Sequence, residues 1–301
     1  MVRPERDWGP NRRGDTPPMD TRTDHAPLEL PADHPGVSDL AYRGRRAAIS
    51  AVGETYRPGQ EIPVVAYAPE EDEVWRTVSA ELAVLHQGLA VAAYRDGVAA
   101  LDLPTARVPQ LGAVSARLDR LTGWTITPVP GLVPTRTFYG SLAERRFCST
   151  QYIRHHSVPF YTPEPDVVHE LVGHANALAE PRFAALYELA GQAALRCETD
   201  AALEAFSRVF WFSLEFGVAW EDGELRAYGA GLLSSFGEIQ AFRRAEVRPL
   251  DVRAMAILDY DITRYQPVLF AADSFVHAHE VLATFFAGWD DDAHARLLAE
   301  T

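Results

Sequence analysis

Hydrophobic residues recur at steps of three and four along several stretches of the chain, which is the spacing of an amphipathic helix. The clearest stretch runs from Glu70 to Tyr94. Its stripe of apolar side chains comprises Trp75, Val78, Leu82, Leu85 and Leu89. Capping residues or an initial proline indicate further helices. These helices are expected over Ser38–Val52, residues 117–123, Phe138–Phe147, Pro181–Ala193, Thr199–Ser213 and from Asp273 or Ser274 onward.

Alternating patterns predict only a few short strands. They cover Trp124–Val129, Glu224–Tyr228 and the extended segment Pro267–Ala272. The sequence shows no repeat, long linker or second core signal, so residues 29–301 are predicted to form one mostly α-helical domain. Residues 1–28 carry five basic and five acidic residues with almost no apolar periodicity, and we expect a disordered tail there.

Composition narrows the classes of partner. The 301 residues are 47% hydrophobic, enough for a substantial core, and carry a formal net charge of −14. That charge argues against a nucleic acid or an anionic membrane surface as the partner, because both attract clustered Lys and Arg. The chain has two cysteines and no apolar run near its N-terminus that resembles a signal peptide. A cytoplasmic protein is the expectation.

The candidate chemistry begins after the proline-containing turn at Pro163–Asp166, where His169 and His174 lie five residues apart. Farther along, Glu215 interrupts an aromatic and aliphatic run, and such a carboxylate is rarely buried without a partner. Two imidazoles and one carboxylate form the facial triad of non-heme Fe(II) oxygenases, which leaves metal positions open for oxygen. We interpret these three residues as metal ligands.

The spacing of the histidines leaves alternatives open. On an ideal α-helix, residues five apart diverge by roughly 140°, so His169 and His174 share a face only if the helix is distorted, and Gly173 offers one place for that. A zinc hydrolase using Glu170 as general base needs histidines four apart, and here there is one residue more. A metal-free amino-acid-binding protein is a third possibility.

With these residues assembled, the chain strongly resembles the pterin-dependent aromatic amino acid hydroxylases from about Leu30 to Phe275. The resemblance is carried by segments in the family's order: Ala32-Asp33-His34-Pro35-Gly36, Thr150-Gln151-Tyr152-Ile153-Arg154-His155, Tyr161-Thr162-Pro163-Glu164-Pro165-Asp166, His169-Glu170-Leu171-Val172-Gly173-His174, Trp211-Phe212-Ser213-Leu214-Glu215-Phe216-Gly217 and Tyr228 to Glu238. It implies the family's catalytic domain fold, with Fe(II) held by His169, His174 and Glu215.

The resemblance also implies roles around the metal. A tetrahydropterin, either tetrahydrobiopterin or a bacterial analogue, would stack on Phe138, with Glu170 near both pterin and iron. The loop that contributes to the pterin site comprises Gly131, Leu132 and Val133. Arg154 would pair with the carboxylate of the substrate amino acid, whereas Trp211 and Phe216 would bound its aromatic ring. Further residues implied near the substrate are Thr162, Pro165, Ser234 and Ser235.

The implied reaction uses O2 and the reduced pterin to hydroxylate an aromatic amino acid. Trp211 favours phenylalanine, because tryptophan-type members tend to carry Phe there, and para attack giving tyrosine is the first expectation. A phenylalanine 3-hydroxylase and a tryptophan 5-hydroxylase remain alternatives within the family. The chain has no room for the regulatory domain and tetramerisation helix of the animal enzymes, so we expect the short bacterial form and a monomer.

Overall fold

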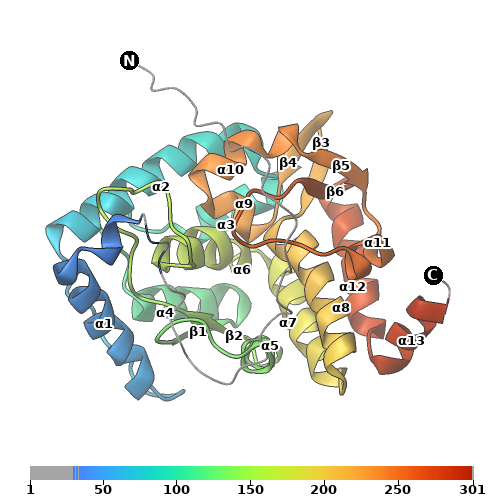
Figure 1. Ribbon diagram of the computed structural model, residues 1–301, viewed down its shortest axis with the longest axis horizontal. Coiled ribbons are helices and arrows are strands. Elements are labelled where there is room, and N and C mark those ends of the chain that lie inside the picture. The colour runs from blue at the N-terminus through green and yellow to red at the C-terminus, as the bar shows by residue number, and fades with distance from the viewer. Residues whose placement is uncertain (1–29, 31, 33, 300–301) are drawn as a thin grey trace.

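The computed structural model describes residues 30, 32 and 34–299, so the predicted tail at 1–28 lies outside the described residues. The described chain is mostly helical, as expected (Figure 1). The longer helices are α1 (Leu40–Thr55), α2 (Pro69–Leu89), α3 (Ala92–Leu101), α4 (Leu111–Thr122), α5 (Thr135–Ala143), α7 (Pro181–Arg196), α8 (Asp200–Phe210), α12 (Phe275–Gly288) and α13 (Asp291–Ala299). Short helices are α6 (Asn176–Leu178), α9 (Ala230–Ser234), α10 (Phe236–Ala241) and α11 (Val252–Ile257), with 3-10 turns η1 (Pro35–Val37) and η4 (Phe242–Arg244).

Two small sheets accompany the helices. The strands are β1 (Thr125–Pro128), β2 (Arg146–Ser149), β3 (Val218–Glu221), β4 (Glu224–Ala227), β5 (Glu246–Pro249) and β6 (Val268–Ala272). Strands β1 and β2 form a parallel pair. The other sheet has the order β4-β3-β6-β5, with β3 antiparallel to β4 and both β5 and β3 parallel to β6.

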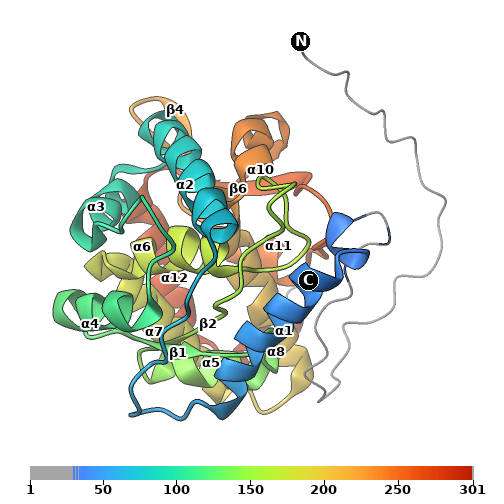
Figure 2. The same ribbon diagram turned by 90° about the vertical axis from the view of Figure 1, so that its left-hand side faces the viewer.

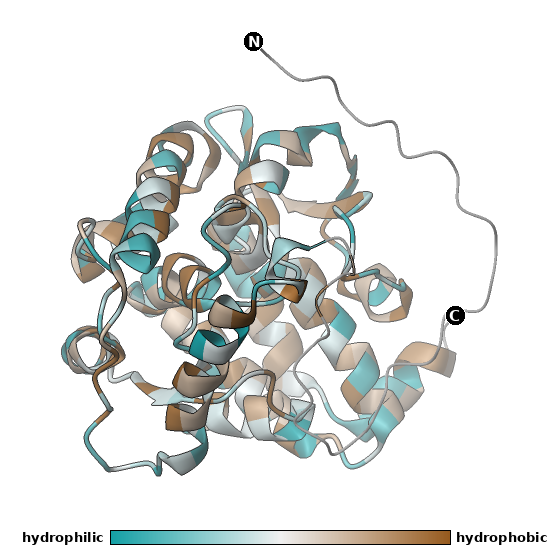
Figure 3. Cartoon of the chain, turned by 60° about the vertical axis from the view of Figure 1, so that its left-hand side comes forward, coloured by the Kyte–Doolittle hydropathy of each residue, from teal (hydrophilic) through white to brown (hydrophobic). Residues whose placement is uncertain are grey.

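One large hydrophobic core joins these elements. Helix α6 lies in the middle of the molecule in both Figure 1 and Figure 2, and its three residues are buried. The surrounding helices carry hydrophobic and hydrophilic residues on different sides, as the two colours on single helices show in Figure 3. None of the helices in the described range combines the length and apolarity needed to cross a membrane.

The structure confirms several predicted boundaries and corrects others. Asp39 caps α1 by accepting the Tyr42 backbone N–H, and Pro181 occupies the first turn of α7. The helix predicted over Glu70–Tyr94 is wrong in its last part: α2 ends at Leu89, and α3 begins a separate helix. The chain is extended in between because the Val91 N–H donates to the Ala227 carbonyl. The helix predicted over Phe138–Phe147 is likewise too long, since β2 pairs its last residues with β1.

Candidate metal centre

His169 and His174 lie on a π-helical segment, η2 (His169–Ala175). In a π-helix the backbone hydrogen bonds join residues five apart, and here the Asn176 N–H donates to the Leu171 carbonyl. Residues at i and i+5 therefore return to the same face, unlike those of an α-helix. This widened turn is the distortion that the five-residue spacing of the histidines required.

Neighbouring elements support the widened turn. The Val172 carbonyl accepts the Tyr94 hydroxyl at 2.6 Å and the Asn176 amide at 3.2 Å. Gly173 also allows a close approach, because a Cβ there would lie 2.8 Å from the Ala230 carbonyl oxygen. The missing side chain lets α9 approach η2, and the end of α9 supplies a contact to His169.

Glu215 ends a second π-helical segment, η3 (Trp211–Glu215), which continues directly from α8. The Phe216 N–H donates to the Trp211 carbonyl at 2.8 Å, again across five residues. A Cβ on Gly229 would lie 2.3 Å from the Glu215 carbonyl oxygen, so the chain after β4 passes Glu215 at a distance only glycine allows. The glycines around residue 230 thus serve close backbone packing beside the carboxylate.

The three predicted ligand residues converge. The Nε2 atoms of His169 and His174 are 2.9 Å apart. The Glu215 carboxylate lies 3.2 Å from the Nε2 atom of His174 and 4.0 Å from that of His169. All three side chains are largely buried. Their ligand atoms face one small volume, which is the arrangement expected of a facial triad.

The second nitrogen of each imidazole is bonded away from this volume. The Nδ1 atom of His169 lies 2.8 Å from the Ser234 hydroxyl, which itself donates to the Ala230 carbonyl at 2.8 Å. The Nδ1 atom of His174 lies 2.8 Å from the Tyr187 hydroxyl. Such partners hold the proton on Nδ1 and leave the Nε2 lone pair for a metal. Sequence reasoning missed Tyr187, because on α7 it falls among apolar core positions.

The protonation states of His169 and Glu215 suit metal binding. Burial and the neighbouring His174 lower the pKa of His169 to about 4, so its imidazole is neutral at pH 7. Burial alone would raise the pKa of Glu215, but the two imidazoles outweigh it and hold that pKa below its usual value. A neutral imidazole and an ionised carboxylate are the forms that bind a cation.

Glu170 is a second carboxyl beside the histidines, and one ligand atom from each of His169, Glu170 and His174 lies within 4.8 Å of the others. Burial, with the charge of Glu215 adding to it, raises the pKa of Glu170 well above its usual value despite bonds from Thr150 at 3.4 Å. A protonated carboxyl is a poor metal ligand. Glu215 is therefore the better candidate for the third ligand, and Glu170 a neighbour of the centre.

Arg154 is bound to a carboxylate of the protein itself. Its Nη2 and Nε atoms donate to the two oxygens of Asp166 at 2.8 and 2.9 Å, and both side chains are buried. Burial alone would raise the pKa of Asp166, but the guanidinium lowers it. The Nη1 atom of Arg154 has a weaker contact, 3.4 Å, to the Pro159 carbonyl. An internal carboxylate was the alternative to the substrate carboxylate as the partner of Arg154, and Asp166 is such a partner.

Apart from Glu170 on η2, the residues predicted for the pterin lie on α5 and in the loop between β1 and α5. Phe138 on α5 is half-buried and makes an edge contact with Phe147, at 6.1 Å between ring centroids. Phe147 in turn lies 4.7 Å from the ring of His174. Gly131, Leu132 and Val133 are in the preceding loop, where Leu132 is exposed. An aromatic surface thus adjoins the metal centre.

The residues predicted to hold the substrate make different kinds of contact in the structure. Trp211 and Phe216 lie side by side, with ring centroids 4.5 Å apart. Trp211 is four residues before the candidate ligand Glu215, and Phe216 directly follows it. The Thr162 hydroxyl donates to the Glu164 carbonyl and Pro165 is half-buried beside it. Ser235 caps α10 by accepting the Glu238 N–H. Ser234 contacts His169, which makes it a support for that imidazole.

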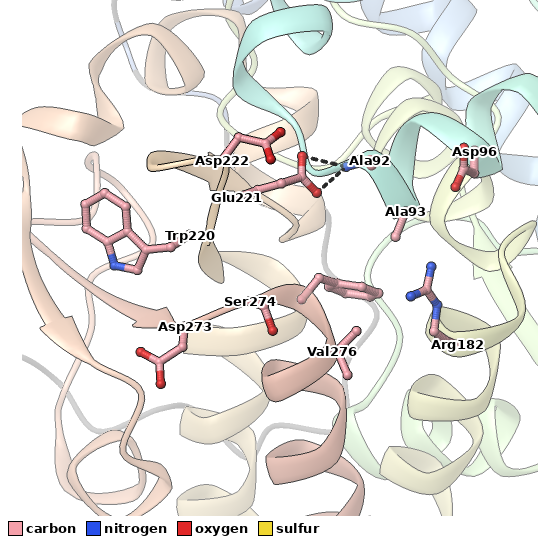
Figure 4. Close-up of a pocket in the computed structure, with 11 residues that line it drawn as sticks. Ala92, Ala93, Asp96, Arg182, Trp220, Glu221, Asp222, Asp273, Ser274 and Val276 are labelled. Atoms are coloured by element: carbon pink, nitrogen blue, oxygen red, sulfur yellow. Dashed lines mark hydrogen bonds between the residues drawn. The ribbon is translucent and has the colours of Figure 1, made fainter.

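A cavity of about 410 Å³ lies apart from this centre (Figure 4). Its carboxylates are Asp96, Glu221, Asp222 and Asp273, and Glu221 accepts the Ala92 N–H at 3.0 and 3.1 Å. None of the predicted site residues lines it. The chemistry of the donor atoms, and not the size of a cavity, locates the site.

Comparisons with known proteins cover most of the chain. A family model, biopterin-dependent aromatic amino acid hydroxylase, matches residues 7–294. The chain is 48% identical to the phenylalanine 3-hydroxylase of Streptomyces coeruleorubidus, covering 89% of this chain and 96% of that one. It is 41% identical to the phenylalanine-4-hydroxylase of Homo sapiens, covering 86% of this chain and 58% of that longer protein.

Comparison with solved structures points to the same family. Phenylalanine hydroxylase of Chromobacterium violaceum with bound Fe(III) superposes with a TM-score of 0.73 at 29% identity, covering 81% of this chain and 90% of that one. A second structure of that enzyme, holding iron(III) and 7,8-dihydrobiopterin, gives the same TM-score over 80% and 90% of the two chains. The chain belongs to the family of biopterin-dependent aromatic amino acid hydroxylases.

Proposed function

We propose that the protein is an Fe(II)- and tetrahydropterin-dependent monooxygenase that hydroxylates the ring of L-phenylalanine with O2. The observation that carries the proposal is the convergence of two imidazole Nε2 atoms and the Glu215 carboxylate within 4.0 Å. His169, His174 and Glu215 would hold the ferrous ion. The neutral imidazole of His169, the ionised carboxylate of Glu215 and the bonds on both Nδ1 atoms fit that role.

The pterin would lie on the ring of Phe138, beside the loop of Gly131, Leu132 and Val133. The iron and pterin, when bound, supply the electrons and the oxygen activation that no side chain provides. Glu170 would lie between them as a protonated carboxyl able to donate a hydrogen bond, in keeping with its raised pKa. The half-buried Phe138 offers the apolar contact such a ring needs.

Binding of the amino acid would fall to residues on either side of the metal. Arg154 would attract the substrate carboxylate through its Nη1 edge, since Asp166 occupies the other two nitrogens. Thr162 and Ser235 would add hydroxyl groups near that end. The aromatic ring would lie among Trp211, Phe216 and Pro165, next to Glu215. The protein's part is to place one ring carbon at the metal and to exclude water.

Two positions of hydroxylation compete. Para attack, giving tyrosine, is the product predicted from the sequence, and several animal relatives are phenylalanine-4-hydroxylases. Meta attack is the second candidate, because the 48% identical relative, matched over 96% of its length, is a phenylalanine 3-hydroxylase. Family membership sets aside the zinc-hydrolase and metal-free binding alternatives.

The test is product analysis. Purified protein with Fe(II), O2 and a tetrahydropterin is offered phenylalanine, tyrosine and tryptophan separately, and chromatography resolves the tyrosine isomers. Either para- or meta-tyrosine from phenylalanine supports the proposal and decides the position. Turnover of tryptophan or tyrosine alone would contradict the substrate, and absence of metal-dependent hydroxylation would contradict the activity.

We also propose that the protein acts as a monomer in the cytoplasm. Cys148 and Cys197 are free and buried, as suits a reducing compartment. Light scattering coupled to gel filtration measures the mass of the assembly directly, and a mass of two or more chains would contradict the monomer.

A further inference from the structure

Trp211 is held by one directional bond in addition to packing. Its indole N–H donates to the Oε1 atom of Gln266 at 3.1 Å. The indole also stacks on Tyr260, with ring centroids 4.3 Å apart and planes 12° apart, and lies against Phe216. Trp211 begins the π-helical segment that ends in Glu215, so its placement is tied to the metal centre.

Gln266 lies in the segment between α11 and β6, and it is the buried member of a largely exposed stretch from 261 to 267. Its Nε2 atom donates to the carbonyls of Asp261 at 3.0 Å and Arg264 at 3.1 Å. Its backbone N–H donates to the Oε1 atom of Glu238 on α10 at 2.7 Å. Gln266 thus joins the 258–267 loop and the indole through its side chain, and α10 through its backbone N–H.

These contacts fix the orientation of the amide. The carbonyls of Asp261 and Arg264 are acceptors only, so the NH2 end of the Gln266 side chain must face them. The oxygen then faces the indole N–H, and the reversed amide would set two donors against each other. A buried amide with all these bonds has one low-energy position. A shift of the 258–267 loop would consequently move the Gln266 amide and, with it, the indole of Trp211.

We propose that Gln266 is a positioning residue that sets, through Trp211, which carbon of the substrate ring is hydroxylated. The inference rests on the proposed function, in which Trp211 and Phe216 bound the ring. Para and meta carbons are neighbours in the ring, and a displacement of about 1 Å changes reactivity on the order of 10²-fold. A small rotation of the indole is enough to change the preferred carbon.

The first experiment compares Gln266→Met with the parent, because methionine keeps the volume and removes the amide. We expect the share of the minor tyrosine isomer to rise about threefold or more, with a smaller fraction of pterin oxidation coupled to hydroxylation. Gln240→Met is the matched control, since Gln240 is exposed on α10 and its amide bonds only to the Phe236 carbonyl among the described residues. The control keeps the parent ratio.

The second experiment is a double-mutant cycle with Trp211→Phe, which removes the indole N–H. If Gln266 acts through Trp211, Gln266→Met adds no further change in isomer ratio in the Trp211→Phe background. Additive changes would overturn the proposal, and so would a parent-like ratio and coupling in Gln266→Met.

Trp211→Phe also tests the link from its other end should Gln266→Met fail to fold, because it leaves the loop contacts of Gln266 in place. An unchanged isomer ratio in that variant contradicts the inference. Failure of the proposed function is recognised separately: the parent protein itself would then form neither tyrosine isomer from phenylalanine.

Discussion

Two buried polar clusters lie next to each other and differ in how their groups are satisfied. In the Arg154–Asp166 pair, each oxygen of the carboxylate meets a guanidinium nitrogen, and Asp166 also accepts the His169 backbone N–H at 3.2 Å. In the metal centre, two imidazole nitrogens and a carboxylate present lone pairs to one shared point. In the first cluster the carboxylate is satisfied within the protein and supports the fold, whereas the lone pairs of the second are arranged to bind a cation.

The largest effect, a loss of activity, should come from removing one of the three candidate metal ligands. Glu215→Ala is expected to abolish iron-dependent hydroxylation, with a loss greater than the roughly 100-fold that outer-shell changes cost. The fold should remain, since the carboxylate interacts mainly with the two imidazoles. Activity, bound iron and circular dichroism are measured together, with the exposed Glu224→Ala as control. Near-parent turnover would refute the ligand assignment.

The next effect should be on stability. Asp166→Ala leaves a buried guanidinium without its partner, so we expect the free energy of unfolding to fall by about 3–5 kcal/mol. Urea denaturation measures it. The control is Glu73→Ala, which breaks an exposed ion pair with Arg76 and should lower the free energy of unfolding far less, because water screens that pair. Equal losses in the two variants would show that the Arg154–Asp166 pair is not the stronger support.

Glu238 provides a pH-dependent test of a third buried group. Burial raises its pKa from 4.5 to about 7. Because the folded protein holds this proton more tightly than the unfolded chain, stability falls as pH rises from about 4.5 to about 7 and is level above that. Glu238→Gln keeps an oxygen for the Gln266 N–H and removes this loss.

Between about pH 5.5 and about pH 8, the parent should lose about 2 kcal/mol of unfolding free energy relative to Glu238→Gln. Parallel pH profiles of the two proteins in urea denaturation would mean that Glu238 ionises normally in the folded state.

The smallest effect should come from the hydroxyl groups that hold the two imidazoles. His169 donates to the Ser234 hydroxyl, which donates in turn to the Ala230 carbonyl, whereas the Tyr187 hydroxyl hydrogen-bonds to His174 alone among the described residues. Tyr187→Phe and Ser234→Ala should each weaken metal binding about 10-fold. Titration of metal-free protein with Co(II), followed by absorption, measures this without turnover. Tyr139→Phe, which removes another buried hydroxyl away from the imidazoles, is the control.

The sequence predicted that His169, His174 and Glu215 converge, because a carboxylate in an apolar run and two nearby histidines are rare without a shared function. It predicted the helices wherever one apolar stripe faced the core. It did not predict the break at Ala90 or the true end of α5, where pairing with distant strands overrides local propensity. Tyr187 looked like a core residue, because periodicity records which side chains are buried but not which buried hydroxyl meets an imidazole.

The widened turn of η2 makes the fold sensitive to the number of residues between His169 and His174. One residue more than an α-helix needs separates His169 from His174, so deleting any residue between them would turn everything from Asn176 onward by roughly 100° relative to what precedes it. The two imidazoles would then share the spacing of a zinc hydrolase, but α6 at the centre of the molecule would present the wrong side to its neighbours. The metal site and the packing of the protein interior therefore both depend on the extra residue between His169 and His174. Deleting it would disturb both at once.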